Sequence, residues 1–412
     1  MIDVAELSLE RQLRHIHVSA TAGGPRRQAA RDGGRPATAQ DALSPGGSKL
    51  GGVTDQDQGV SFPWRPASAT GAGSMPGTDP AEAARIVLGE LPDFPHLPEL
   101  PDRGPGAELA GRALALLVEM PAVVTPTGWR LADRAGLDLR RARGYLSRDL
   151  DALEEAAEGY SGPLKIQVCG PWTLAASVEL PSGQPALSDP GATRDLAGSL
   201  AEGIAAHVTD VARRNPGARM VLQFDEPALP AVLRGGVPTA SGLRRLNPVE
   251  EAIVEDGLAS MFDRVRGGSP GTEREPFIIV HCCAAGVPFG LIRGAGAQGV
   301  SFDLALLRRR DEDAFAETAE AGLGLLAGVL DLDTERRSAA ASGNPPGGVS
   351  VKETMVPVSE LWRRLGLPPG QVAGQVVLTP ACGLAGVSAA EARAAMARCR
   401  DAGRALAEEM AG

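Results

Sequence analysis

The chain has 412 residues, a formal net charge of −10 and 5 cysteines. Its length allows a large buried core, in one big domain or two smaller ones, and its acidic balance argues against a nucleic-acid partner. Because the cysteines are too few for a disulfide framework and no long apolar run is present, we expect a cytoplasmic protein with reduced thiols and no membrane span.

Residues 1–66 differ in composition from the rest of the chain. Gly, Pro, Ala, Arg and Ser dominate this segment, and its apolar residues follow no period. Such a segment buries too little apolar surface to offset the entropic cost of becoming ordered. We predict that residues 1–66 are disordered or form an extension, and that residues 67–412 form the catalytic domain.

Short apolar runs alternate with longer segments of helical periodicity from residue 68 onward. This alternation predicts strands that are each followed by a helix. An α/β fold of the (β/α)8 TIM-type barrel class fits these units, and a doubly wound open sheet is the alternative. The predicted strands are 68–74, 122–127, 164–171, 219–227, 276–283, 299–306, 323–331 and 375–382.

Three possible metal ligands lie at the ends of two predicted strands. His281 and Cys283 end the run PFIIVHCC, and Cys382 ends the run QVVLTPAC. Residues two apart on a strand point to the same face, so His281 and Cys283 can hold one ion while Cys282 faces away. An imidazole and two thiolates form the soft nitrogen and sulfur site that suits Zn²⁺ and leaves one position for a substrate.

The metal site has a candidate oxygen ligand and an alternative interpretation. Asp303 ends the strand that follows His281 and Cys283 along the chain, where its carboxylate can complete the ligand set. The alternative is that the cysteines are small buried hydrophobic residues, which is the usual environment of free cysteine.

Two further motifs place polar groups at strand ends. In VLQFDEPALP, Asp225 and Glu226 point to opposite sides, so one carboxylate faces the mouth of the barrel. It can hold a substrate ammonium group, or it can cap a helix or pair with an arginine. In GAGSMPGTDP, small residues allow backbone N–H groups to approach a carboxylate or phosphate, although a plain turn between strand and helix fits equally well.

Taken in order, the motifs of residues 68–410 resemble those of the cobalamin-independent methionine synthase family, in its short forms with only the C-terminal zinc-containing barrel. They are GSMPGTD, CGPWTLAAS, QFDEPALP, the HCC segment, GVLDLDT and LTPACGL. The resemblance implies that homocysteine is held by a turn at Ala72, Gly73 and Ser74 and by Asp225. It implies zinc ligands at His281, Cys283 and Cys382, with Asp303 where the family has a glutamate.

The resemblance also implies two replacements in the site. Asp333, in GVLDLDT, stands where the family has a histidine that assists proton transfer, so we assign it the catalytic role. Glu108 is a stand-in for a family glutamate that helps to hold homocysteine and that Pro105 replaces here.

The expected activity is transfer of a methyl group to the thiol of homocysteine, giving methionine. The donor is of the methyltetrahydrofolate type or a corrinoid, which can be carried by a corrinoid protein. Two alternatives are a metal-free barrel enzyme like uroporphyrinogen decarboxylase and a non-catalytic barrel stabilised by zinc.

Overall fold

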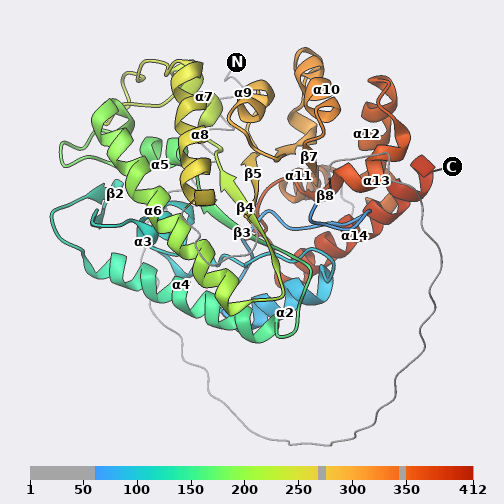
Figure 1. Ribbon diagram of the computed structural model, residues 1–412, viewed down its shortest axis with the longest axis horizontal. Coiled ribbons are helices and arrows are strands. Elements are labelled where there is room, and N and C mark those ends of the chain that lie inside the picture. Colours follow the sequence, from blue (N-terminus) through green and yellow to red (C-terminus); the bar gives the residue numbers. More distant parts are fainter. Residues whose placement is uncertain (1–60, 268–274, 343–348, 412) are drawn as a thin grey trace, which may run out of the picture. The chain divides into compact units, whose positions relative to one another are not determined.

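The computed structural model describes residues 61–267, 275–342 and 349–411. A parallel sheet curls through the α/β fold, and its strands are hydrogen-bonded in chain order. Figure 1 shows helices arranged around this sheet. The sheet contains β3 (Pro163–Cys169), β4 (Arg219–Asp225), β5 (Phe277–Cys282), β6 (Gly299–Asp303), β7 (Gly324–Leu330) and β8 (Val376–Pro380).

Six of the predicted strands are thereby confirmed, whereas the one at 122–127 belongs elsewhere. β1 (Ala122–Thr125) pairs antiparallel with β2 (Gly128–Leu131), which the sequence analysis missed, in a sheet of its own. The apolar run correctly predicted an extended segment. It could not indicate the partner strand, and the two turn residues Pro126 and Thr127, followed by Gly128, favoured a local hairpin.

Two extended segments connect the edge strands β8 and β3 through isolated parallel bridges. Ala69 bridges to Leu378 of β8, and His96 bridges to Lys165 of β3. A third bridge, between Ser74 and Glu99, joins the two segments to each other. The first segment was predicted as the strand 68–74, whereas the second was not among the predicted strands.

The helices follow the strands in the expected alternation. Asp79 begins the first of them, where its side chain accepts hydrogen bonds from the N–H groups of Ala81 and Glu82, as N-cap residues do. The helices are α2 (Pro80–Glu90), α3 (Leu109–Leu116), α4 (Leu137–Ala156), α5 (Pro171–Ser177), α6 (Pro190–Arg214), α7 (Leu229–Arg234), α8 (Glu251–Gly267), α9 (Phe289–Gly294), α10 (Glu312–Glu320), α11 (Leu332–Ser342), α12 (Val351–Arg364), α13 (Val372–Gln375) and α14 (Ala389–Ala411).

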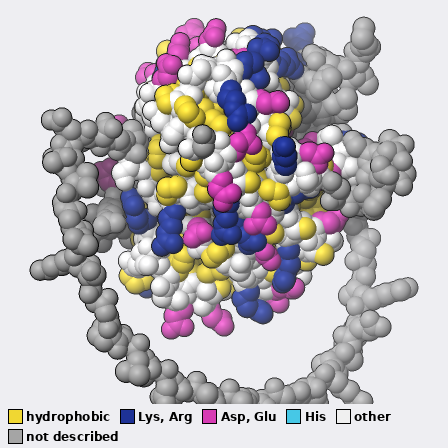
Figure 2. All heavy atoms as spheres, turned by 90° about the vertical axis from the view of Figure 1, so that its right-hand side faces the viewer, with side chains coloured by type: hydrophobic (Ala, Val, Ile, Leu, Met, Phe, Trp, Pro, Cys, Tyr) yellow, Lys and Arg dark blue, Asp and Glu magenta, His cyan; other side chains and the backbone are white. Residues whose placement is uncertain are grey.

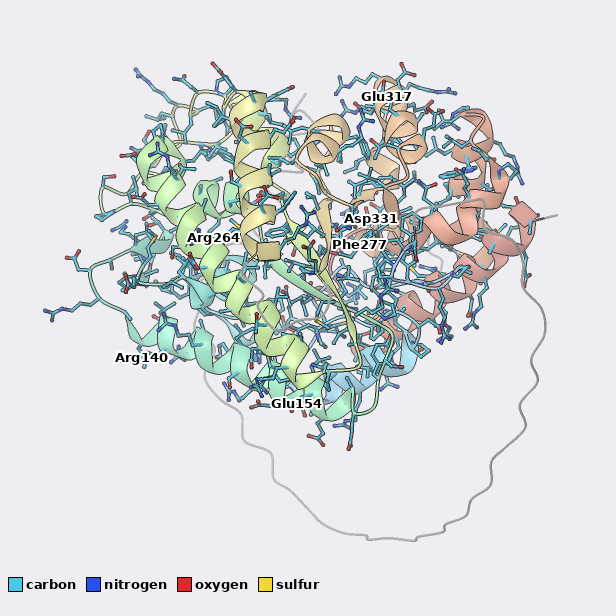
Figure 3. All side chains as sticks on the ribbon, viewed as in Figure 1. Arg140, Glu154, Arg264, Phe277, Glu317 and Asp331 are labelled. Carbon is cyan, nitrogen blue, oxygen red and sulfur yellow. The ribbon has the colours of Figure 1, made fainter. Side chains whose placement is uncertain are left out.

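Charged side chains lie on the outward faces of these helices. Arg140 and Glu154 of α4 and Glu317 of α10 lie at the periphery of the view in Figure 3, and Arg264 of α8 is also exposed. Asp331, labelled in the same view, lies among the central elements just after β7. On the face seen in Figure 2, acidic, basic and hydrophobic side chains are interspersed over the described residues.

Two hydrophobic clusters stabilise the fold. The larger one packs helices against the sheet. The smaller one gathers residues from separate strands, Val221, Ile279, Leu326 and Val377, around Trp64 and Phe94. Side chains alternate between the two faces of a strand. Lys165 of β3 and Gln223 of β4 both point to the inner face of the sheet, where they contact each other. Other polar side chains lie nearer the carboxyl edge of the sheet.

Most of the predicted segment 1–66, namely residues 1–60, lies outside the described residues. Trp64 is described and buried, stacking on Phe94, so the packed part of the chain includes residues just before the predicted boundary. Among the described helices, none combines the length and apolar character needed to cross a lipid bilayer.

Candidate functional site

A cavity of about 510 Å³ opens at the carboxyl ends of the parallel strands. Asp225 and Asp303 are the last residues of β4 and β6, and Cys283 directly follows β5. The structure brings every site residue predicted from the sequence to the wall of this one cavity. These residues are Ala72, Gly73, Ser74, Glu108, Asp225, His281, Cys283, Asp303, Asp333 and Cys382.

The two cysteine sulfurs form the centre of the candidate metal site. Cys382 Sγ lies 3.7 Å from Cys283 Sγ, and the two share a hydrogen bond. This contact raises the pKa of the Cys283 thiol well above its usual value and holds the pKa of Cys382 well below it. The separation is far longer than a disulfide of about 2.05 Å. It is close to the roughly 3.8 Å between two sulfur ligands that each lie about 2.3 Å from a tetrahedral zinc ion.

His281 is held by a neighbouring strand. Its Nδ1 lies 2.8 Å from the hydroxyl of Ser301 on β6, and both residues are buried. A ring that donates its Nδ1–H to Ser301 keeps a lone pair on Nε2, which is the arrangement of metal-binding histidines. The nearby imidazole also helps to lower the pKa of the Cys382 thiol, and all three predicted nitrogen and sulfur donors line the cavity.

Asp303 completes this side of the cavity but is already engaged. Its Oδ1 accepts a hydrogen bond of 2.9 Å from the N–H of Ala305. Burial raises the pKa of Asp303 to about 7, and the nearby charge of Asp331 adds to the shift. As the side chains stand in the described residues, no group of three or more His, Cys, Asp or Glu has the geometry of a metal site. The donor chemistry of His281 and the two cysteines and their sulfur–sulfur distance fit zinc. The carboxylate of Asp303 instead accepts a hydrogen bond from the backbone.

The two acidic residues at the end of β4, Asp225 and Glu226, point to opposite sides, as the strand alternation predicted. Asp225 faces the cavity, and its Oδ1 accepts a 2.7 Å hydrogen bond from Gln223 Nε2. Burial raises the pKa of Asp225 to about 7, an effect that His281 opposes and Glu99 reinforces. Glu226 turns away to cap α5, accepting bonds of 2.9 and 2.7 Å from the first backbone N–H groups of that helix.

The predicted substrate turn, residues 72–74, lies beside the loop that carries Cys382. The carbonyl of Ser74 accepts a 2.8 Å hydrogen bond from the N–H of Leu384. A Cβ at Gly383 would collide with the hydroxyl of Ser74. A larger residue after Cys382 would therefore have to displace the Ser74 side chain.

Glu108 lines the cavity, but its carboxylate is engaged in structural contacts at both oxygens. It begins α3 as the N-cap, accepting bonds of 3.0 Å from the N–H of Gly111 and 2.7 Å from that of Gly106. Trp129 Nε1 donates a third bond to it. These three hydrogen bonds satisfy both oxygens of the Glu108 carboxylate without a substrate.

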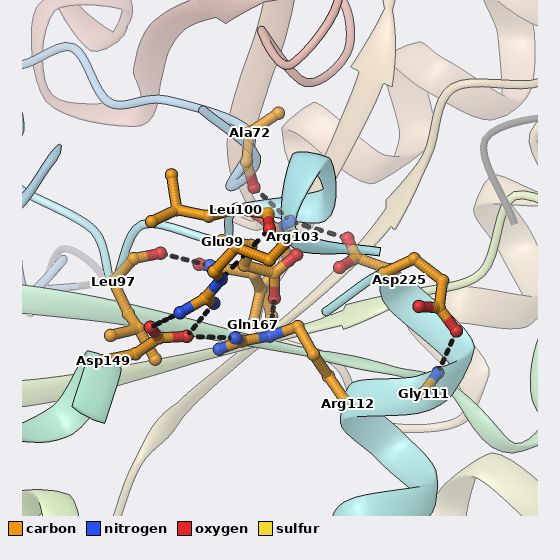
Figure 4. Close-up of polar contacts among 12 residues, drawn as sticks. Ala72, Leu97, Glu99, Leu100, Arg103, Gly111, Arg112, Asp149, Gln167 and Asp225 are labelled. Carbon is orange, nitrogen blue, oxygen red and sulfur yellow. Dashed lines mark hydrogen bonds and ion pairs between the residues drawn. The ribbon is translucent and has the colours of Figure 1, made fainter. Parts of the chain in front are cut away.

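Glu99 is a buried carboxylate on the cavity wall that the sequence analysis missed. Figure 4 shows its anchoring network. Arg112 Nε lies 3.1 Å from Glu99 Oε1, and Arg112 also pairs with Asp149, which Arg103 holds at 2.7 and 2.8 Å. Burial raises the pKa of Glu99, against the attraction of Arg112. Prolines flank Glu99 in the sequence, and this segment was not among the predicted strands.

Asp333 lies at the exposed rim of the cavity, in the first turn of α11. Asp331, at the start of this helix, accepts a 3.0 Å bond from the N–H of Thr334. Arg337 also lines the cavity, and its Nη2 donates a 2.7 Å bond to the hydroxyl of Thr334. The sequence analysis did not single out this arginine.

Comparisons with known proteins identify a fold and leave the family open. No model of a known protein family matches the chain, and no curated protein matches it. A B12-independent methionine synthase from Shewanella sp. W3-18-1, solved in complex with selenomethionine, matches with a TM-score of 0.53 and 12% identity, covering 84% of this chain and 99% of that one.

This likeness shows a shared α/β fold and no more, because the identity is so low. A second solved structure, of an uncharacterised protein, is 15% identical, covers 65% of this chain and 68% of its own, and has a TM-score of 0.27.

Proposed function

We propose that this protein is a zinc-dependent methyltransferase that moves a methyl group to the thiol of homocysteine, giving methionine. The observation that carries the proposal is the convergence of His281, Cys283 and Cys382 in one cavity with Asp225 and the 72–74 turn. These residues were chosen from separate sequence motifs, and the fold collects them at the carboxyl ends of parallel strands, where barrel enzymes bind their substrates.

We infer that the sheet closes into an eight-membered barrel. The segments around Ala69 and around His96 take the first two strand positions, between β8 and β3. The support is a series of backbone hydrogen bonds that crosses the three junctions, from Thr70 N to Leu378 O at 3.2 Å, from Glu99 N to Gly73 O at 3.2 Å and from Leu97 N to Lys165 O at 2.8 Å. Both segments make few such bonds, which is why they form bridges and not full strands.

His281, Cys283 and Cys382 would hold the zinc ion, with Asp303 as the candidate fourth ligand. Support comes from the sulfur–sulfur distance of 3.7 Å and from the hydrogen bond that orients His281 through Ser301. When bound, the ion lowers the pKa of a substrate thiol and keeps the resulting thiolate nucleophilic at neutral pH.

The remaining groups of the cavity would bind the amino-acid part of homocysteine. The turn at 72–74 offers backbone N–H groups to the carboxylate, and Asp225 accepts the ammonium group. Glu99 is a better second partner for this ammonium than Glu108. Both oxygens of Glu108 are occupied by three structural donors. Glu99 lies near Asp225, because its charge raises the pKa of that carboxyl. Burial disfavours the charged forms of both Asp225 and Glu99. A cation bound between them would stabilise these charged forms.

The transfer itself joins the substrate sulfur to the methyl carbon while the bond from that carbon to the donor breaks, and the donor leaves with the bonding electron pair. The thiol proton is released, and Asp333 at the rim is the carboxylate we assign to accept it; a leaving nitrogen of a methyltetrahydrofolate-type donor takes up one proton in turn, whereas a corrinoid needs none. A methyltetrahydrofolate-type molecule or a corrinoid would supply the methyl group from the open side of the cavity.

Metal analysis and methyl transfer test the proposal together. The purified protein should contain zinc, and a cobalt-substituted sample should develop a thiolate charge-transfer band when homocysteine is titrated in. Methionine should form from homocysteine with methyltetrahydrofolate or methylcobalamin as donor, and Cys283→Ser and Cys382→Ser should each abolish this. Cys399→Ser, which alters a buried cysteine in α14 away from the cavity, is the matched control. Full activity in both cavity variants would refute the role of zinc.

A further inference from the structure

We propose that Lys165 and Gln223 are positioning residues for the amino-acid part of the substrate, because they join the 72–74 turn to Asp225 from beneath the cavity. This inference rests on the function proposed above. Neither residue belongs to the cavity wall, so each would act through the groups that it holds.

A single carbonyl oxygen connects the two sides of the amino-acid site. Lys165 Nζ donates to the carbonyl of Ala72 at 2.9 Å, and Gln223 Nε2 donates to the same oxygen at 2.9 Å. Gln223 Nε2 also donates to Asp225 Oδ1 at 2.7 Å, and its Oε1 accepts from Lys165 Nζ at 2.8 Å. The turn and the carboxylate therefore have a fixed relation to each other.

The direction of the Ala72 carbonyl determines where the next amide points. In a trans peptide unit, the C=O of one residue and the N–H of the next point in opposite directions. Because Lys165 and Gln223 draw the Ala72 oxygen towards the inside of the sheet, the N–H of Gly73 is turned the other way, towards the cavity that Gly73 lines. This is the group that the proposed function assigns to the substrate carboxylate.

A role in packing alone does not explain these side chains. Both are buried, with 0% of Lys165 and 1% of Gln223 exposed, and burial of an ammonium group is costly. Their strand neighbours in register, Val221 opposite Lys165 and Ile279 opposite Gln223, are apolar. Burial lowers the pKa of Lys165 to about 8, against the attraction of Asp225 and Glu99. The two polar side chains therefore stand beside apolar ones and contact the groups that they hold.

The test compares a substrate that needs the amino-acid site with one that does not. In Gln223→Leu and Lys165→Met, the KM for homocysteine should rise by about tenfold or more, as expected for loss of a buried hydrogen bond that orients a charged ligand. The KM for propane-1-thiol, which lacks the amino and carboxylate groups, should stay within about twofold of the wild type. Gln223→Glu keeps the volume and the acceptor for Lys165 but loses the donor, so it should reproduce the effect of Gln223→Leu even if the apolar variant folds poorly.

Gln375→Leu is the matched control. Gln375 is also buried, and its Nε2 donates to two backbone carbonyls, of Ala319 at 2.7 Å and Leu323 at 2.9 Å, but it does not line the cavity. This variant should leave the KM for both thiols unchanged.

The outcomes separate this inference from the proposed function. A wild-type protein that neither binds nor methylates homocysteine would refute both. A wild type that methylates homocysteine, together with variants at Lys165 and Gln223 whose KM for homocysteine is unchanged, would overturn this inference alone. An equal rise in KM for homocysteine and for propane-1-thiol would also overturn it, because the effect would then be a general distortion of the cavity.

Discussion

Replacing Ser301 by alanine should weaken zinc binding without unfolding the protein. The change removes one buried hydroxyl that lies 2.8 Å from His281 Nδ1. Such a hydrogen bond contributes about 0.5–1.5 kcal/mol, which corresponds to about 2- to 13-fold in an equilibrium constant. Groups that orient metal-binding histidines typically change affinity by about 10- to 100-fold. We therefore expect a loss of zinc affinity of about tenfold.

The affinity can be measured by competition with a chromophoric zinc chelator, so the result does not depend on activity. Ser359→Ala is the control, because Ser359 is equally buried and donates to a backbone carbonyl at 3.2 Å within α12, outside the cavity. A Ser301→Ala protein that binds zinc as tightly as Ser359→Ala would refute the role of this hydrogen bond. A wild-type protein that binds no zinc would refute the metal site itself.

Two further predictions concern the loop contact and the pH dependence of stability. Gly383→Ala should raise the KM for homocysteine by about tenfold in steady-state assays, because its Cβ displaces the Ser74 side chain of the substrate turn. Gly370→Ala is the control: its added Cβ meets nothing within 4 Å, so the KM should be unchanged. Burial lowers the pKa of His207 to about 4. The unfolded chain therefore binds more protons below about pH 6.5, and the free energy of unfolding should fall between pH 6.5 and 4. Urea titrations across this range should show a smaller fall in the free energy of unfolding for His207→Gln than for the wild type. An identical fall would show that His207 does not cause this pH dependence.

Much of this fold was predictable because its central strands are mostly apolar. The strands from β3 to β8 are buried on both faces, so β-branched and other apolar residues predominate in them, although β3 and β4 also carry the buried polar residues Lys165 and Gln223. The segment around His96 lies beside β3 through an isolated bridge, and it contains Pro95 and Pro98, which donate no backbone hydrogen bonds. Its pairing depends on contacts with distant strands that no local pattern records.

The candidate site was predictable where a residue directly ends a strand. His281, Cys283, Asp303 and Cys382 follow from strand periodicity and meet in one cavity. The sequence could not distinguish Glu99 from Glu108, because both are single acids in loops. Which of them can receive a substrate depends on the donors around each carboxylate, and those donors come from residues far away along the chain.

The contrast between these two glutamates shows how the fold prepares a binding group. Glu108 accepts bonds at both oxygens, two of them from backbone N–H groups, and its work is to begin a helix. Glu99 is held by the side chain of Arg112, and a buried ion pair with Asp149 fixes the position of Arg112. Breaking such a buried network leaves an unpaired charge at a cost of about 3–5 kcal/mol, so the network holds Glu99 firmly in the cavity wall. A carboxylate that other side chains anchor, and that begins no helix, is suited to bind a substrate cation, which supports Glu99 as the second partner of the ammonium group.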